Sequence, residues 1–173
     1  SVTDMRDAFG ELESLSDRPQ YRNRDAKLDH HTKQNLDGCL LFPTLGVGME
    51  SALENDLPAL QAAFSAFNRW LAEDWGFSYK DRLFAAPYIT LSDVQHAISE
   101  LEFAIDNNVR VINFRASAVT TADGQKSPAD PIFDDFWKRV NDAGITAAFH
   151  AGDAAYDFLV AHWGLSTEFE AFR

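Results

Sequence analysis

VRVINFR, residues 109–115, is the stretch that decides the fold, because its β-branched and aromatic residues predict a buried strand. Helical patterns lie on both sides of it. Residues 92–107 carry apolar side chains three or four positions apart, and residues 130–144 begin with Asp130-Pro131, a typical helix start. A strand between two helices is the repeating unit of a parallel α/β sheet.

The same alternation continues in both directions along the chain. Short apolar runs predict three further strands, at residues 38–43, 82–89 and 145–150, the first of them buried on both faces. A helix is predicted over Leu57–Trp75, with Trp70 widening its apolar stripe. Strand and helix therefore alternate from residue 38 to residue 150, which predicts right-handed crossovers and a parallel sheet.

The remaining local signals concern loops and a helix start. Residues 44–48, with two glycines, are expected to form a flexible loop. Residues 116–129 are expected to form a polar loop that turns at Asp123-Gly124. Ser92 is the expected N-cap of the helix that follows it, because a glutamine stands three residues further on.

The composition is that of a globular domain with a strongly acidic balance. Lysine and arginine number 15 against 27 aspartates and glutamates, a formal net charge of −12, which excludes a surface for nucleic acid or an anionic membrane. Hydrophobic residues make up 46% and aromatic residues 13%, which excludes a disordered acidic tail. The single Cys39 excludes an internal disulfide, and a cytoplasmic location is expected.

The chain divides into a short lead-in and one larger unit. Residues 1–37 are charge-dense and predict polar helix and loop, whereas residues 38–173 form one α/β domain. The length of 173 residues falls short of the roughly 250 that a closed eight-stranded α/β barrel needs. Two architectures fit the alternation: a doubly wound open sheet, or part of a barrel.

Two polar side chains stand at predicted carboxyl ends of strands, where parallel α/β folds bind ligands. His150 could bind a metal or transfer protons, or a backbone carbonyl could satisfy it. Arg115 could clamp a substrate carboxylate, or pair with a nearby acid. Asp153 could orient His150 but more simply caps a following helix, and His162 could approach the site if the chain folds back. No catalytic residue can be assigned from these patterns.

Three segments resemble the amidohydrolase superfamily, in particular the amidohydrolase-2 branch related to aminocarboxymuconate-semialdehyde decarboxylase. They are Phe42-Pro43-Thr44, the run Arg82–Ile89, and the run from Asp130-Pro131 to His150-Ala151-Gly152. The resemblance covers about residues 36–153 and implies a (β/α)₈ barrel, with the four predicted strands resembling strands two to five. It also implies a divalent metal, commonly zinc, and hydrolysis or non-oxidative decarboxylation of a small carboxylate or amide-type substrate.

Within that resemblance, His150 takes the position of the metal ligand at the end of strand five, and Arg115 remains a residue expected to contact substrate. No His-x-His occurs in the chain, and strands six to eight have no place in the remaining residues. We therefore expect a fragment that is inactive alone, from an intact enzyme that could form a homo-oligomer. The alternative is a self-contained, non-catalytic open-sheet binding module.

Overall fold

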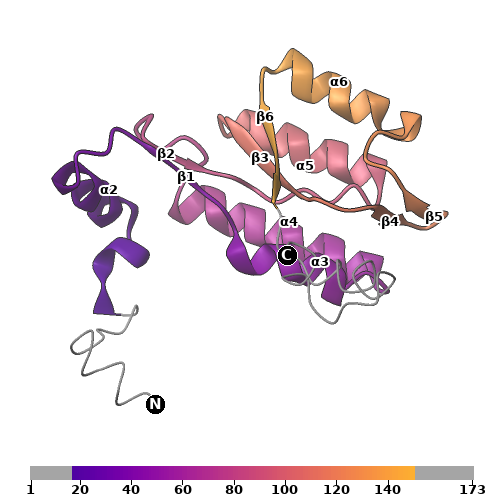
Figure 1. Ribbon diagram of the computed structural model, residues 1–173, viewed down its shortest axis with the longest axis horizontal. Helices are drawn as coiled ribbons and strands as arrows, with labels where there is room; N and C mark the ends of the chain where they lie inside the picture. Colours follow the sequence, from indigo (N-terminus) through magenta and orange to yellow (C-terminus); the bar gives the residue numbers. More distant parts are fainter. Residues whose placement is uncertain (1–16, 151–173) are drawn as a thin grey trace, which may run out of the picture.

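The computed structural model describes residues 17–150 and shows a mixed α/β arrangement of parallel strand pairs and helices (Figure 1). Four strands lie side by side in chain order: β1 (Cys39–Leu41), β2 (Leu83–Ala85), β3 (Val111–Arg115) and β6 (Thr146–His150). β1 pairs with β2, β3 pairs with β6, and a single parallel bridge between Tyr88 and Asn113 joins the two pairs. The predicted parallel pairing is therefore confirmed in the described part of the chain.

Three helices, α4 (Leu57–Asp74), α5 (Val94–Asp106) and α6 (Asp134–Asp142), pack against one face of these strands. The described residues also form α2 (Arg24–Lys33), α3 (Thr44–Ala52) and short 3₁₀ turns at Pro19–Tyr21 and Pro131–Phe133. The core lies between the strands and α4, α5 and α6. Ile112 and Phe114 of β3 pack there against Leu101 of α5 and Phe136 of α6.

Most predicted helix ends are confirmed, because local backbone chemistry determines them. The Asp130 side chain accepts a hydrogen bond from the Ile132 N–H (3.1 Å), as an N-cap should. Gly76 (φ +75°) follows α4, and Gly144 (φ +66°) follows α6. Both adopt the left-handed conformation that commonly ends a helix.

Two sequence-based expectations about local structure are wrong. Residues 44–48 begin the helix α3 rather than form a loop, because the Glu50 carboxylate is anchored to Tyr88 and Thr90 and outweighs the weak helix propensity of the glycines. The N-cap of α5 is Asp93, not Ser92: the Asp93 carboxylate accepts from the His96 N–H at 2.7 Å.

The polar loop expected over residues 116–129 contains a β-hairpin. β4 (Val119–Thr121) pairs antiparallel with β5 (Gly124–Lys126), and Gly124 takes φ +98° at the turn. The β-branched run of β4 was the available signal, but three residues are too short to distinguish a strand from a loop by periodicity.

Two predictions about which side chains are buried are also wrong. Leu40, in the middle of β1, is 53% exposed, so this strand is covered on one face rather than two. Trp70 of α4 is 46% exposed and adds nothing to the buried stripe, which consists of Leu60, Phe64, Asn68 and Leu71. Among residues 17–150, no helix is both long enough and apolar enough to cross a membrane.

The polar lead-in contributes α2 to the described structure. The Asn23 side chain caps this helix by accepting from the Asp25 and Ala26 N–H groups. Arg82, next to β2, fastens the end of α2 by donating to the Leu36 and Asp37 carbonyls. The boundary at residue 37 stays a prediction.

Candidate functional site at the carboxyl ends of the strands

Arg115 and His150 are register partners, each the last residue of its strand. Partner residues of a parallel pair point to the same side of the sheet, and successive residues alternate between sides. Because Ile112, Phe114 and Ala147 pack in the core beneath the helices, Arg115 and His150 point to the opposite side. The two residues that the sequence singled out therefore lie side by side.

We call that opposite side the inner face. It is formed by every second residue of the four strands and by the residue that follows β1: Leu40, Phe42, Phe84, Val111, Asn113, Arg115, Thr146, Ala148 and His150.

His150 contacts the opposite edge of the inner face. Its ring lies edge-on to the ring of Phe42, with centroids 5.9 Å apart and planes at 62°. Phe42 follows β1, so the contact spans the strand order from one outer strand to the other. The Nδ1 atom of His150 is buried and has no hydrogen-bond partner within residues 17–150. The backbone carbonyl that could have satisfied this nitrogen is therefore not found among those residues.

Arg115 lies largely buried beside an acid. Its Nη1 atom is 3.9 Å from Glu54 Oε2, an ion pair without a hydrogen bond. Glu54 follows α3, so the pair links that helix to the end of β3. Arg115 therefore pairs with a nearby acid, Glu54, which is one of the two roles expected from the sequence. Contact between Arg115 and a substrate stays a prediction.

The sequence analysis missed Glu50, a buried carboxylate of α3 at the same strand ends. Glu50 Oε2 accepts from the Tyr88 hydroxyl at 2.6 Å, and Oε1 accepts from Thr90 Oγ1 at 2.7 Å. Glu50 and Arg115 line a hollow of about 10 Å³, the room of one water molecule. The signal available in the sequence was an acid two residues after the segment interpreted as a loop, residues 44–48.

Asn113 was also missed. It lies on the inner face two residues before Arg115, is fully buried, and its Oδ1 and Nδ2 atoms have no hydrogen-bond partner in the described part of the chain. An asparagine inside a β-branched strand was the signal available in the sequence.

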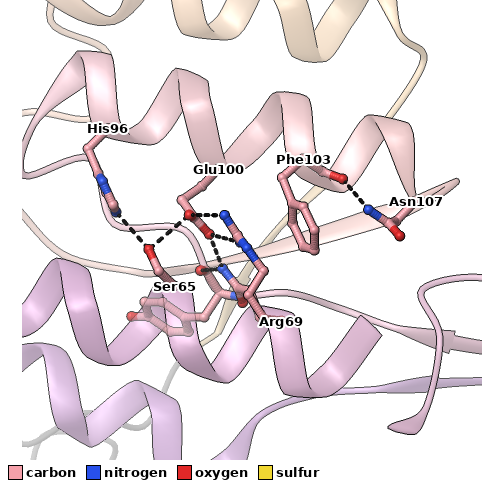
Figure 2. A network of polar contacts seen from close by, with 8 residues as sticks. Ser65, Arg69, His96, Glu100, Phe103 and Asn107 are labelled. Carbon is pink, nitrogen blue, oxygen red and sulfur yellow. Dashed lines mark hydrogen bonds and ion pairs between the residues drawn. The ribbon is translucent and has the colours of Figure 1, made fainter. Parts of the chain in front are cut away.

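A second polar cluster, between α4 and α5, has the chemistry of a structural network (Figure 2). Arg69 donates to both oxygens of the buried Glu100 at 2.9 Å, and Ser65 (2.8 Å) and Asn68 (3.0 Å) donate to the same carboxylate. Burial raises the pKa of Glu100, but these hydrogen bonds from Arg69, Asn68 and Ser65 outweigh it and hold the pKa below its ordinary value. His96 Nε2 lies 3.4 Å from Ser65 Oγ. With every oxygen of Glu100 paired, this cluster fastens two helices.

Residues 17–150 hold no group of three or more histidine, cysteine, aspartate or glutamate side chains that could share one metal ion. A catalytic zinc site needs about three protein ligands. At the carboxyl ends of the strands, the described residues offer a metal the imidazole of His150. Asp153 and His162, the other two candidates from the sequence, lie outside the described residues.

Parallel strands with polar side chains at their carboxyl ends define the general layout of α/β enzymes. The solved structure of an amidohydrolase from Mycobacterium avium subsp. paratuberculosis K-10 is similar to this chain, with a TM-score of 0.84 and 35% sequence identity. The similarity covers 91% of this chain and 41% of that one, so the chain spans about two fifths of its neighbour's length. No family model and no curated protein matches the chain.

The similar structure is described as an amidohydrolase, and the similarity supports the resemblance of this chain to the amidohydrolase superfamily. Members of this superfamily generally use divalent metals.

Proposed function

We propose that this chain forms part of a metal-dependent hydrolase of the amidohydrolase-2 branch, in which His150 binds the metal and Arg115 contacts a small-molecule substrate. The observation that carries the proposal is the position of His150. It ends β6 on the inner face beside Arg115, with a buried Nδ1 that has no partner within residues 17–150. An imidazole nitrogen left free at the carboxyl end of a parallel strand is suited to metal binding.

The metal, zinc in this proposal, would supply Lewis-acid polarisation of a carbonyl and activation of water. The described residues supply one ligand to it, which is too few to hold zinc alone. The remaining ligands would therefore come from residues other than 17–150. What the described residues contribute is the placement of His150, fixed by the β3–β6 register and by the Phe42 ring.

The proposal also assigns β1, β2, β3 and β6 to strands two to five of a barrel. Two features support it. The inner face carries a hollow of about 420 Å³ lined by Leu40, Phe84, Val111 and Thr146, where further strands would pack. Both outer strands also expose large apolar side chains, Leu40 on β1 and Phe149 on β6. The neighbour is more than twice as long as this chain, in keeping with a part that is inactive alone.

Two alternatives make different predictions. Decarboxylation would use the same metal position, but the similar protein is described as an amidohydrolase, which favours hydrolysis. A non-catalytic binding module would need no metal, and the incomplete ligand set within residues 17–150 favours it.

The proposal also places the protein in the cytoplasm. Burial raises the pKa of the free Cys39 thiol, which keeps it protonated.

Zinc binding by the intact enzyme, of which this chain is proposed to be a part, tests the proposal. The intact enzyme is expected to bind zinc, and His150→Ala is expected to weaken that binding at least tenfold. His30→Ala is the matched control, because His30 lies on α2, away from the strand ends, and it should leave zinc binding unchanged. Equal zinc binding by both variants would contradict the assignment of His150.

A further inference from the structure

The helix α3 lies between β1 and α4 in the chain and has little local support of its own. Gly46 and Gly48 lower its helix propensity, and no side chain caps its first turn, which begins after Pro43. A helix of nine residues with these features is marginal in water when it stands alone. Contacts with other parts of the chain must therefore hold α3 in place.

Tyr88 is the side chain against which α3 packs. The Tyr88 hydroxyl donates to Glu50 Oε2 at 2.6 Å, and one turn earlier a Cβ added to Gly46 would lie 3.5 Å from the Tyr88 ring. Tyr88 itself is fully buried and firmly held. Its ring stacks on Phe64 of α4 with centroids 4.4 Å apart, and the Asn68 side chain pairs with both its backbone N–H and its carbonyl. The helix α3 therefore packs against a fixed ring.

Glu50 supplies the polar contacts between α3 and this ring. Its second oxygen, Oε1, accepts from Thr90 Oγ1 at 2.7 Å, so hydroxyl groups from one short segment hold both oxygens of a buried carboxylate. Hydrogen bonds to a charged group are stronger than those between neutral groups. A movement of α3 away from Tyr88 would break both of them, and Glu50 therefore fixes the position of the helix.

The first turn of α3 is joined to Phe42 by a stiff connection. Phe42 immediately precedes Pro43, whose ring restricts its φ angle. The Pro43 carbonyl accepts from the Gly46 N–H at 2.9 Å, and a Cβ added to Gly46 would lie only 3.3 Å from the Pro43 Cβ. Because this turn is tightly packed, a displacement of α3 would carry Phe42 with it.

Phe42 in turn contacts the imidazole of His150. The two rings meet edge-on with centroids 5.9 Å apart, and this contact limits the rotation of the imidazole. Phe42 is 37% exposed, so the core does not fix its ring, and its position depends on the segment that carries it. A metal ligand must present its nitrogen in a set direction, and the residues around such ligands usually provide that orientation.

From these contacts we infer that Glu50 is a positioning residue for His150. By fixing α3 against Tyr88 and Thr90, Glu50 holds the Phe42 ring on the imidazole and limits access to it. Glu50 acts through α3 and Phe42. The inference rests on the proposed function in treating His150 as a metal ligand. The contact between Phe42 and His150 needs no metal, so it is measured without one.

The test measures the reactivity of His150 in the intact enzyme of which this chain is proposed to be a part, with a chelator present. Diethylpyrocarbonate is the probe, and mass spectrometry gives the rate of modification at His150. Glu50→Gln should raise this rate by roughly threefold or more, because an amide nitrogen cannot accept from a hydroxyl and α3 opens more often. Tyr88→Phe, which keeps the ring and removes one donor, should raise it by less. Glu100→Gln is the matched control, a buried acid between α4 and α5, and should leave the rate unchanged.

A double variant separates this positioning role from a merely structural one. If Glu50 acts through Phe42, Glu50→Gln should add nothing to the rate in a Phe42→Ala background, where the ring is already absent. An equal rise in both backgrounds would overturn the inference, and so would an unchanged rate at His150 in the single variants. If Glu50→Gln does not fold, Tyr88→Phe in the two backgrounds decides by the same criterion. Zinc binding that depends on His150 is measured separately, so failure of this inference and failure of the proposed function are distinguishable.

Discussion

The rings of Phe42 and His150 meet with their centroids 5.9 Å apart, although Phe42 follows the first strand of the parallel order and His150 ends the last. Four strands laid flat would separate the outer two by roughly 14 Å, three times the usual spacing. The contact brings side chains from the two edges of the strand order together. Convergence of this kind is how a curved parallel sheet brings residues from several strands to one site.

Removing the Phe42 ring should expose His150 with little effect on stability. In Phe42→Ala, the lost edge-on contact accounts for about 0.5–1.5 kcal/mol. The rate at which diethylpyrocarbonate modifies His150, measured by mass spectrometry, should rise, while the rate at His30 should not change. An unchanged rate at His150 would mean that Phe42 does not cover it.

Arg69→Leu should destabilise the chain strongly. It leaves the buried carboxylate of Glu100 without its cation, and breaking a buried pair in this way typically costs about 3 kcal/mol or more. Arg139→Leu is the matched control, because the Arg139–Glu102 pair is nearly half exposed and should contribute less than about 1 kcal/mol. Urea unfolding measures both, and equal losses would refute the structural role of the Glu100 network.

Stability should fall as pH is lowered from 7 to 5, and His31 should account for part of the change. Burial lowers the pKa of His31, and the positive charges of Lys27, His30 and Arg82 lower it further. The unfolded chain therefore binds a proton at a higher pH than the folded chain. The neutral His31 side chain therefore makes its full contribution to stability above the ordinary histidine pKa near 6.5. This contribution is lost as pH falls from there through the lower pKa that His31 has in the folded chain.

Comparison of two neighbouring histidine variants tests this linkage. His31→Leu should flatten the dependence of the unfolding free energy on pH between 7 and 5, whereas His30→Leu should leave its slope nearly unchanged. A slope in His31→Leu that equals that of the parent chain would contradict the assignment.

Two glycines should respond to alanine in opposite directions. Gly144 has φ +66°, and Gly144→Ala should destabilise the chain by about 1 kcal/mol because a Cβ is strained in that conformation. Gly48 lies in the helix α3 with open space where a Cβ would stand, so Gly48→Ala should stabilise the chain by about 0.5–1 kcal/mol. Thermal unfolding measures the change in stability of both variants. A gain in stability in Gly144→Ala would contradict the left-handed conformation of this residue.

Local signals in the sequence predicted much of the fold. The β-branched run at residues 109–115 and the Asp130-Pro131 start depend on neighbouring residues only, and both were located correctly. The alternation of strand and helix also predicted that Arg115 and His150 lie at one edge. What it could not supply is their exact register, which depends on backbone pairing between β3 and β6.

The features that were missed depend on contacts between distant residues. α3 is a helix because Glu50 reaches Tyr88 and Thr90, about forty residues further along the chain. The Asn113 amide has no hydrogen-bond partner within residues 17–150, and this depends on how distant residues pack around it. The Phe42–His150 contact joins residues from the two edges of the strand order, and a list of predicted strands does not specify which side chains meet across them.

The central claim is that the imidazole of His150 is a metal ligand at the carboxyl ends of these strands. The most direct measurement is the effect of Co²⁺, a paramagnetic substitute for zinc, on the histidine ring signals of the intact enzyme of which this chain is proposed to be a part. The account predicts that the His150 signals broaden and shift at the lowest Co²⁺ concentrations, before those of His30, and that Zn²⁺ reverses the effect. Equal broadening of His150 and His30 across the titration would contradict it.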